Sequence, residues 1–389
     1  WQDNSFTSLG LRIKAQALDS GMAAVGGPIV VSSAANSKTA GDQEKPKVAV
    51  LPNGGGAVVV WQGGKVGFQQ IYARFLGANG LPLKKSDIRV SAQAKLSQSD
   101  PAVVALADGN VVVVWSSFGQ DGSMKGVFAR RFSSEGVPLG AEFRVNQIVA
   151  YNQRSPDVAL LADGRFVVAW ISELQRGPAS VDVYARIFSA AGIATGEEFP
   201  VNTSTNNPCA NPAVAGSSQG GFAVAWSQKD GGKFASASDP NDPTGVANPF
   251  SKPGVQAYSG TARSMISWDV YGRFYSIDGN PISEPTVLNA YTYGDQFAPR
   301  LSSSGTNYMA VWTSLAQDGD QREGVFGRWL SANGALQGTE LHINTTTVNQ
   351  QFQPCVISNE SDSFLTLWSG FVRRNGFDLF SRTYQLSTP

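Results

Sequence analysis

Short apolar segments recur along the chain at a nearly constant interval, and turn-forming residues separate them. Each unit opens with a proline in a segment of the form Pro-x-Val-Ala-x-Leu, and a run of β-branched residues ending in tryptophan follows. The prolines are spaced by 55, 55, 56, 87 and 55 residues, and they are Pro46, Pro101, Pro156, Pro212, Pro299 and Pro354. Self-similarity at a fixed period predicts a repeat architecture.

Each unit contains four segments with the composition of β-strands, here called a, b, c and d in chain order. Asp-Gly pairs join a to b at Asp108-Gly109 and at Asp163-Gly164. This pair favours tight hairpins because both residues tolerate positive φ. The b–c links carry similar pairs at Asp121-Gly122, Asp230-Gly231, Asp318-Gly319 and Asn375-Gly376. We find no helical period, so the chain is predicted to be all-β.

Four antiparallel strands in about 55 residues are typical of one blade of a β-propeller. A single propeller domain over residues 1–389 is therefore predicted, with a partial unit at 1–45 and a final partial unit at 354–389. Full units begin at 46, 101, 156, 212 and 299, with an insertion at about 229–267. A β-solenoid is the second interpretation and a string of sandwich domains the third.

The two partial units determine how the ring closes. Trp1 aligns with the tryptophan of strand b, residues 13–18 align with strand c, and residues 28–33 align with strand d. The last unit supplies strands a, b and c and ends near Tyr384. Six blades are favoured if the N-terminal strand d completes the C-terminal blade. Seven blades are expected if residues before Trp1 supplied strands a and b.

Three further residue types keep their place in the repeat and predict a structural framework. The tryptophans that close strand b should be buried between sheets, and they are Trp61, Trp115, Trp170, Trp226, Trp312 and Trp368. An arginine in strand c should bond carboxylates or backbone carbonyls between strands or blades, and it recurs as Arg74, Arg130, Arg186, Arg273, Arg328 and Arg382. A glutamine three residues before the proline should bond the backbone of the d–a crossover, and Cys209 takes its place in the fourth unit.

The balance of charges excludes several classes of partner. The 389 residues include 30 Lys and Arg against 30 Asp and Glu, so no basic surface for nucleic acid or anionic membrane is predicted. Charged residues are only 15% of the chain, compared with about 25% in ordinary soluble proteins, as is common in secreted β proteins. No apolar run reaches the length of a membrane helix. The chain begins at Trp1, which is compatible with a removed signal peptide.

The repeat Pro-x-Val-Ala-x-Leu-x-Asp-Gly, followed by a strand ending in Trp and by Val-Tyr-Ala-Arg, resembles propeller-type repeats of large secreted or surface-exposed bacterial proteins, some of them RTX-type or adhesin-like. The resemblance covers nearly the whole chain. It implies an extracellular, cell-surface or periplasmic propeller module, but no defined activity and no site residues. The calcium-binding nonapeptides that often accompany such proteins are absent from the sequence.

Residues suited to catalysis or metal binding are few. His342 is the only histidine, no Gly-x-Ser-x-Gly motif is present, and one histidine is too few for zinc. Neither Cys209 nor Cys355 lies near a motif, and the sequence leaves open whether the two are bridged. No catalytic residue, metal site or cofactor is predicted. Calcium at Asp121, Asp230 and Asp318 is the alternative to plain hairpin turns, and the segment 239–242 has too few oxygens for an EF-hand loop.

The insertion at about 229–267 is the largest departure from the repeat. It is rich in Gly, Pro and Ser, and its aromatic residues Phe234, Phe250 and Tyr258 are candidates for contact with another protein or another copy of this chain. The favoured hypothesis is a non-enzymatic structural or protein-interaction module. The alternatives are a carbohydrate-binding, lectin-like propeller and a glycoside-active enzyme with an opposed carboxylate pair. Against the enzyme, sialidase-type Asp-boxes are absent and most acids fall at turns.

Overall fold

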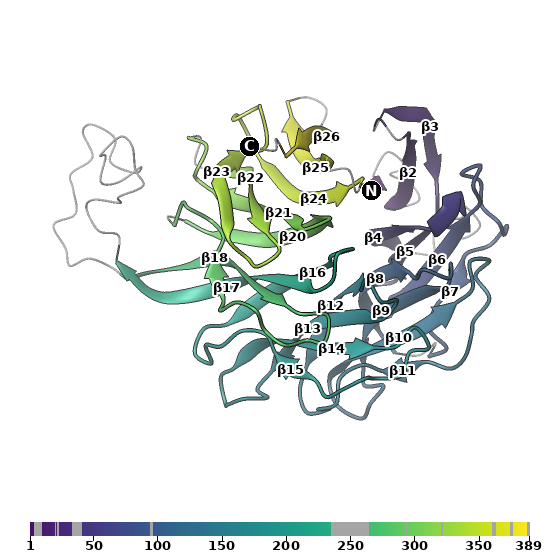
Figure 1. The fold of residues 1–389 in the computed structure, drawn as a ribbon. Helices are drawn as coiled ribbons and strands as arrows, with labels where there is room; N and C mark the ends of the chain where they lie inside the picture. Colours follow the sequence, from purple (N-terminus) through teal and green to yellow (C-terminus); the bar gives the residue numbers. More distant parts are fainter. Residues whose placement is uncertain are drawn as a thin grey trace.

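The chain folds into a ring of antiparallel sheets. The computed structural model describes residues 1–3, 10–19, 21, 23–32, 41–93, 96–234, 264–292, 294–319, 322–359, 363–373 and 376–386. Their strands form seven sheets, which follow one another around a central axis in the order of the sequence (Figure 1). The protein is therefore an all-β, seven-bladed propeller.

The first and last blades have three strands each, and the five between them have four. Blade 1 comprises β1 (Gln2–Asp3), β2 (Arg12–Leu18) and β3 (Ala24–Val30). Blade 2 comprises β4 (Asp42–Val50), β5 (Ala57–Gly64), β6 (Gln70–Leu76) and β7 (Ile88–Arg89), with a 3-10 turn, η1 (Pro52–Gly54), between β4 and β5. Blade 3 comprises β8 (Gln98–Ala105), β9 (Val111–Phe118), β10 (Lys125–Phe132) and β11 (Phe143–Arg144).

The remaining blades repeat this plan. Blade 4 comprises β12 (Gln153–Leu160), β13 (Phe166–Glu173), β14 (Val181–Phe188) and β15 (Phe199–Pro200). Blade 5 comprises β16 (Cys209–Gly216), β17 (Phe222–Phe234), β18 (Ser264–Tyr275) and β19 (Thr286–Val287). Blade 6 comprises β20 (Gln296–Ser304), β21 (Asn307–Leu315), β22 (Glu323–Ser331) and β23 (Leu336–His342), and blade 7 comprises β24 (Gln351–Ser358), β25 (Ser363–Val372) and β26 (Gly376–Gln385).

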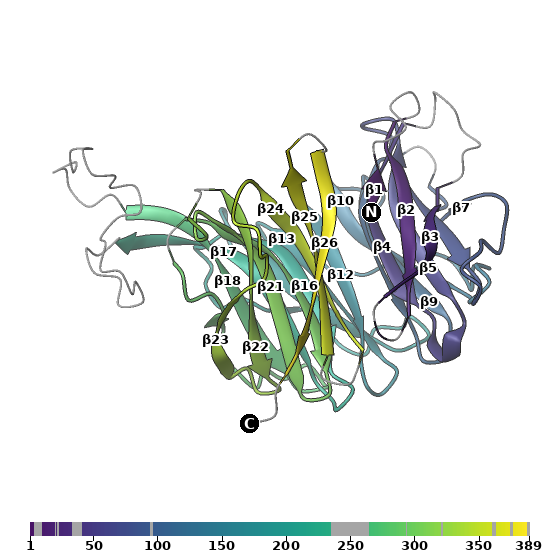
Figure 2. The ribbon, with the colours of Figure 1, turned by 90° about the horizontal axis from the view of Figure 1, so that it is seen from above.

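The prediction of six blades is wrong, because the N-terminal strand d does not join the C-terminal blade. β3 pairs instead with β2, with Lys14 opposite Val30 and Leu18 opposite Ala24. Pairing within a local hairpin closes a short loop, whereas joining the two ends of the chain closes a very long one. The first three strands thus form their own sheet, which lies between blades 2 and 7 (Figures 1 and 2).

Each complete innermost strand carries a bulge immediately before its repeat proline. The bulged residue has positive φ in every case, and the six are Lys45, Asp100, Ser155, Asn211, Ala298 and Gln353. The backbone N–H of this residue donates a hydrogen bond to a side chain of the preceding blade. The accepting side chain belongs to the residue that follows the strand-b tryptophan. Gln62 accepts from Asp100, Ser116 from Ser155, and Ser227 from Ala298, at 3.0–3.1 Å. The repeat proline excludes the right-handed helical conformation at this residue, and the bond between blades fixes the left-handed one.

Apolar cores fill the spaces between neighbouring blades. Five of the strand-b tryptophans are 0% exposed and Trp368 is 5% exposed, which confirms the prediction that they are buried at equivalent positions. Buried clusters join blades 1 to 2, 2 to 3, 3 to 4, 4 to 5, 5 to 6 and 6 to 7. Among the described residues, no such cluster joins blade 7 to blade 1. Within the described part of the chain, the ring therefore has one interface without an apolar core.

Four of the repeated arginines connect blades through backbone carbonyls, as the sequence predicts, whereas Arg74 pairs with Asp87 in its own blade. The guanidinium of Arg186 donates to the carbonyl of Gly196 in its own blade at 2.9 Å and to that of Val145 in blade 3 at 3.1 Å. Arg130 and Arg273 make the same pair of bonds in their blades. Their role is structural, because each guanidinium replaces the missing backbone partner of a short outer strand.

The repeated glutamines also have the predicted structural role. Gln153 donates to the carbonyl of Ala150 in the d–a crossover at 2.7 Å, and Gln43 donates to that of Gly41 at 3.0 Å. Gln43 and Gln351 additionally accept the indole N–H of the tryptophan in their own blades. The indole N–H groups of Trp115, Trp170 and Trp312 have no hydrogen-bond partner among the described residues.

Candidate functional site

The aromatic residues proposed to contact a partner lie wholly or partly outside the described residues. Phe250 and Tyr258 lie outside the described residues, and Phe234 is the last residue of β17, with a side chain that is also outside them. Contact of the insertion with another protein stays a prediction.

His342 has a packing role. Its ring stacks on Phe326 with 4.7 Å between centroids, and its Nε2 lies 3.7 Å from Oδ2 of Asp318. Both cysteines are free: Cys209 is buried in blade 5, and Cys355 is exposed on the innermost strand of blade 7. No serine or cysteine nucleophile is bonded to this histidine among the hydrogen bonds of the described chain.

The aspartates of the b–c links are bonded by protein groups. Asp121 accepts the backbone N–H of Ser123, as in an ordinary Asx turn. Asp230 is 8% exposed and accepts from the hydroxyl of Tyr271 at 2.5 Å and from the amides of Asn207 and Gln228. The described residues contain no group of three or more His, Cys, Asp or Glu suited to hold a metal ion.

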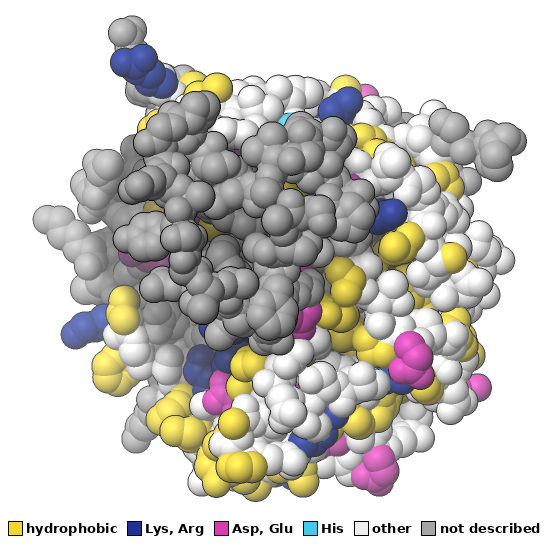
Figure 3. Space-filling view, turned by 90° about the vertical axis from the view of Figure 1, so that its left-hand side faces the viewer, with side chains coloured by type: hydrophobic (Ala, Val, Ile, Leu, Met, Phe, Trp, Pro, Cys, Tyr) yellow, Lys and Arg dark blue, Asp and Glu magenta, His cyan; other side chains and the backbone are white. Residues whose placement is uncertain are grey.

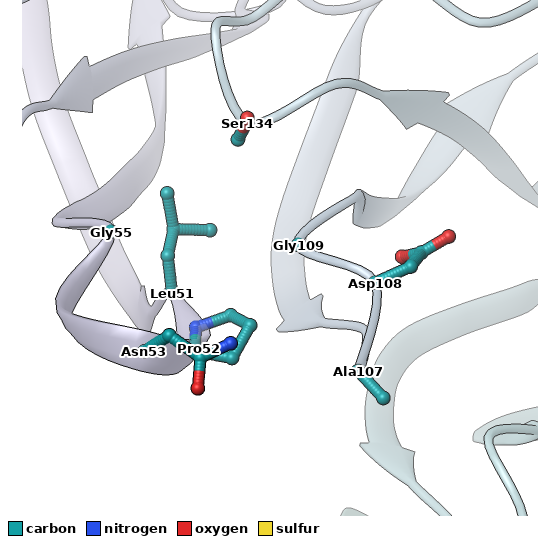
Figure 4. A pocket seen from close by; sticks show the side chains of 8 residues that line it. All are labelled: Leu51, Pro52, Asn53, Gly55, Ala107, Asp108, Gly109 and Ser134. Atoms are coloured by element: carbon teal, nitrogen blue, oxygen red, sulfur yellow. The ribbon is translucent and has the colours of Figure 1, made fainter.

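A surface pocket of about 240 Å³ lies between blades 2 and 3, where strand a turns into strand b (Figure 4). Its walls are the hairpin of Leu51, Pro52, Asn53 and Gly55, the hairpin of Ala107, Asp108 and Gly109, and Ser134. The one carboxylate, that of Asp108, is bonded within its own turn to the backbone N–H and side-chain amide of Asn110. The pocket therefore offers no pair of groups for acid–base chemistry.

Charged side chains gather instead at the end of the ring where the innermost strands begin, which we call the upper end. Asp100 on β8 accepts from Nζ of Lys45 on β4 at 2.5 Å and from the hydroxyl of Ser99 at 2.9 Å. That serine hydroxyl accepts from Nζ of Lys125 on β10 at 3.1 Å. The bonds link blades 2 and 3 around a carboxylate whose side chain is 22% exposed.

Blade 4 contributes a second carboxylate to the same end. Glu173, the last residue of β13, accepts from Nε of Arg154 at 2.6 Å and from the amide of Asn152 at 2.8 Å. Lys125 acts electrostatically on both Glu173 and Asp100 and lowers the pKa of each. We call these five residues, Lys45, Asp100, Lys125, Arg154 and Glu173, the carboxylate cluster.

Both carboxyl groups of the cluster favour the ionised form, for different reasons. For Asp100, burial is the largest effect and raises the pKa, but the charge and hydrogen bond of Lys45 outweigh it and the pKa is lowered. For Glu173, burial again opposes ionisation, and the bonds from Asn152 and Arg154 lower the pKa. The Lys45 side chain is 55% exposed, so the ammonium group that keeps Asp100 ionised is open to solvent.

The two carboxylates of the cluster do not recur at the equivalent positions of other blades. They are therefore separate from the structural framework that the repeated residues form. The residue equivalent to Asp100 is Ser155 in blade 4 and Ala298 in blade 6, and the residue equivalent to Glu173 is Phe118 in blade 3 and Leu315 in blade 6. Framework carboxylates, in contrast, recur. Glu142, Glu198 and Glu340 each accept the backbone N–H of a residue that follows strand d in the preceding blade.

Sequence reasoning missed Asp100 and Glu173 because it assigned the acids to turns. The signal was available at positions of the repeat where one unit alone carries a carboxylate. Elsewhere the described residues form further ion pairs, such as that of Arg165 with Asp163 and Asp278. On the side shown in Figure 3, the described Lys, Arg, Asp and Glu residues are scattered among polar and hydrophobic side chains.

Comparison with known proteins identifies the architecture. No protein-family model and no curated protein sequence matches the chain. Among solved structures, a protein of unknown function from Dyadobacter fermentans matches with a TM-score of 0.56 at 10% identity, over 95% of this chain and 98% of that one. An α-L-arabinanase of Penicillium chrysogenum, solved with arabinobiose, matches with a TM-score of 0.53 at 12% identity, over 88% and 93% of the two chains.

A third match is the GH93 α-L-arabinofuranosidase of Fusarium graminearum, with a TM-score of 0.53 at 12% identity over 90% of this chain and 96% of that one. At these identities the likeness establishes the fold. The comparison nevertheless contradicts the favoured hypothesis of a non-enzymatic module, because the arabinanase and the arabinofuranosidase among the matched propellers are glycoside-cleaving enzymes. The prediction that the protein is not an enzyme is corrected accordingly.

Proposed function

We propose that this protein cleaves glycosidic bonds, with Asp100 and Glu173 as its two catalytic carboxylates. The observation that carries the proposal is the carboxylate cluster itself: two acidic side chains on adjacent blades, both acted on by Lys125, at one end of the propeller. Glycoside hydrolysis requires such a pair, one group to donate a proton and one to attack or to activate water. The substrate class suggested by the architecture is an α-L-arabinofuranosyl-containing glycan.

The surroundings of the two carboxylates assign different roles to them. Glu173 is held by Arg154 and Asn152, whose bonds keep it ionised as a nucleophile or general base. Asp100 depends on the half-exposed Lys45 for its ionisation. When a sugar displaces the Lys45 ammonium, burial dominates and the pKa of Asp100 rises, which makes it the general acid.

The two carboxyl groups of the cluster can supply and accept the protons that the reaction requires. Asp100 donates its proton to the glycosidic oxygen as the bond to the anomeric carbon breaks, and the leaving sugar departs as an alcohol. Glu173 either takes a proton from the water that attacks the anomeric carbon or attacks that carbon itself before water releases the sugar. Proton NMR of the first product distinguishes these routes, because one inverts and the other retains the anomeric configuration.

The experiment is hydrolysis of arabinan and arabinobiose by the parent protein and by Asp100→Asn and Glu173→Gln. Each variant should lose about 10²- to 10⁴-fold in kcat/KM, the usual contribution of one acid–base group. Asp108→Asn is the matched control, since this carboxylate is engaged within a hairpin turn. Parent-level activity in both site variants, or absence of hydrolysis by the parent on arabinan and a panel of other polysaccharides, would contradict the proposal.

An extracellular, cell-surface or periplasmic location accords with this function, because polysaccharides of this kind lie outside the cell. The low charge content and the resemblance to repeats of secreted bacterial proteins support the same location. The one helical element of the described residues, η1, is too short to cross a membrane.

A further inference from the structure

Three phenylalanines gather at the upper end of blade 7. Phe352 is the second residue of β24, Phe371 is the last but one of β25, and Phe377 is the second of β26. The ring of Phe377 stands nearly perpendicular to both others, with 5.1 Å between its centroid and that of Phe352 and 5.3 Å to that of Phe371. Such edge-to-face contacts are favourable and hold the rings in fixed orientations. We call these three residues the aromatic platform.

The aromatic platform is open to solvent, unlike the aromatic residues of the framework. Phe377 is 51% exposed and Phe371 is 36% exposed, whereas Trp368 on the same strand as Phe371 is 5% exposed. The backbone N–H of Phe371 donates to the carbonyl of Gln350 at 2.9 Å, which ties the end of β25 to the crossover from blade 6. Exposed rings that are already held in place lose little conformational entropy when they bind a ligand.

The repeat places the aromatic platform at the same level as the carboxylate cluster. Phe371 follows its strand-b tryptophan by three residues, as Glu173 does, and Phe377 precedes its strand-c arginine by five residues, as Lys125 does. Equivalent positions of different blades lie at the same end of a propeller. Blade 7 is separated from blade 3 by blades 1 and 2, and from blade 4 by blades 5 and 6, so it stands across the ring from the cluster (Figure 1). The platform and the cluster therefore border the same end of the ring from opposite sides.

We propose that the aromatic platform binds a sugar ring of a long glycan chain whose scissile bond lies at the carboxylate cluster. The C–H groups of a sugar face carry partial positive charge and pack favourably on the negative face of an aromatic ring. A glycan is the occupant that this placement favours, because a long chain held at the cluster crosses the end of the ring toward blade 7. The choice of ligand rests on the proposed function. A disaccharide held at the cluster should not reach the platform, so the site selects long chains.

Isothermal titration calorimetry with arabinohexaose and arabinobiose tests the proposal in the full chain carrying Glu173→Gln, which keeps the probes intact. Adding Phe371→Ala or Phe377→Ala should weaken binding of arabinohexaose about threefold to tenfold, the usual effect of losing one aromatic contact, and should leave binding of arabinobiose unchanged. Phe377→Tyr keeps the ring and should restore the affinity. Ile282→Ala is the matched control, because Ile282 is also 51% exposed but lies in the c–d link at the other end of blade 5.

The outcomes separate the failure of this site from the failure of the proposed function. Weaker arabinohexaose binding in the platform variants supports the site even when the parent protein cleaves no glycan. Unchanged binding in folded Phe371→Ala and Phe377→Ala, or no binding of arabinohexaose at all, would overturn the site even when the parent hydrolyses arabinan. Sedimentation velocity tests the other occupant: a parent dimer that Phe377→Ala converts to a monomer would assign the platform to a contact between copies and overturn the sugar site. Circular dichroism establishes that each variant is folded.

Discussion

The backbone N–H of Asp100 donates a 3.1 Å hydrogen bond to Oε1 of Gln62, and this bond crosses from blade 3 to blade 2. Asp100 has a φ of 55°, a conformation that L-residues adopt at a cost. Gln62 therefore stabilises both the contact between blades 2 and 3 and the backbone conformation of a proposed catalytic residue. The same hydrogen bond between blades recurs between Ala298 and Ser227, and neither of these residues belongs to the carboxylate cluster.

This duplication allows a paired prediction. Gln62→Leu should reduce the free energy of unfolding by about 1–3 kcal/mol, because a buried N–H loses its acceptor, and should also reduce glycoside cleavage. Ser227→Ala should cost comparable stability and leave cleavage unchanged. Urea denaturation and initial rates measure the two effects. Equal loss of activity in both variants would show that stability alone accounts for it.

Lys45→Met should move the pH dependence of cleavage. In the parent protein, Lys45 lowers the pKa of Asp100 against the effect of burial, and without Lys45 the pKa of Asp100 rises. If Asp100 donates the proton, the alkaline limb of the kcat/KM profile reports its pKa in the free enzyme, so this limb should shift to higher pH. Lys85→Met, which removes an exposed lysine, is the control. A limb that stays in place would remove Asp100 from the role of acid.

The tryptophans of strand b provide a test of the framework. The indole N–H of Trp61 donates to Oε1 of Gln43 at 2.7 Å, whereas that of Trp312 has no partner, although both rings are 0% exposed. Replacement by phenylalanine removes the same volume at both positions. Trp61→Phe should therefore cost about 1–2 kcal/mol more than Trp312→Phe, through the hydrogen bond alone. Thermal unfolding of the two variants measures this difference, and equal costs would show that packing dominates at both sites.

The sequence predicts the framework well because every blade needs the same structural contacts, which therefore recur as the same residues. Pro101, Trp115 and Arg130 recur because each blade needs a bulge, a buried ring and a bond to its neighbour. The blade number was harder, since it depends on whether β3 pairs with β2 or with β26, and both pairings suit the composition of the strands. Asp100 and Glu173 share the influence of Lys125 only because blades 3 and 4 are adjacent, so their relation is not visible in either repeat alone.

Blades 1 and 7 have one partly uncovered face each, because no apolar cluster of the described chain joins them. Ile357 on β24 is 51% exposed, whereas Ala159, which occupies the same place in blade 4, is 8% exposed. In a repeat protein, stability is approximately a sum of the contacts between neighbouring units. Blade 7 is therefore expected to be among the first to open.

Hydrogen exchange and cysteine labelling should both detect this opening. Amides of β24 and β25 should exchange about 10- to 100-fold faster than those of β12 and β13, because opening at the end of the ring breaks one core and opening in the middle breaks two. The exposed Cys355 should react with a bulky thiol reagent in the native protein, and the buried Cys209 should react only as the whole protein unfolds. Cys355→Ser, which removes the fast reaction alone, confirms the assignment. Uniform protection across all seven blades would instead mean that polar contacts hold blades 1 and 7 together as firmly as the apolar cores hold the others.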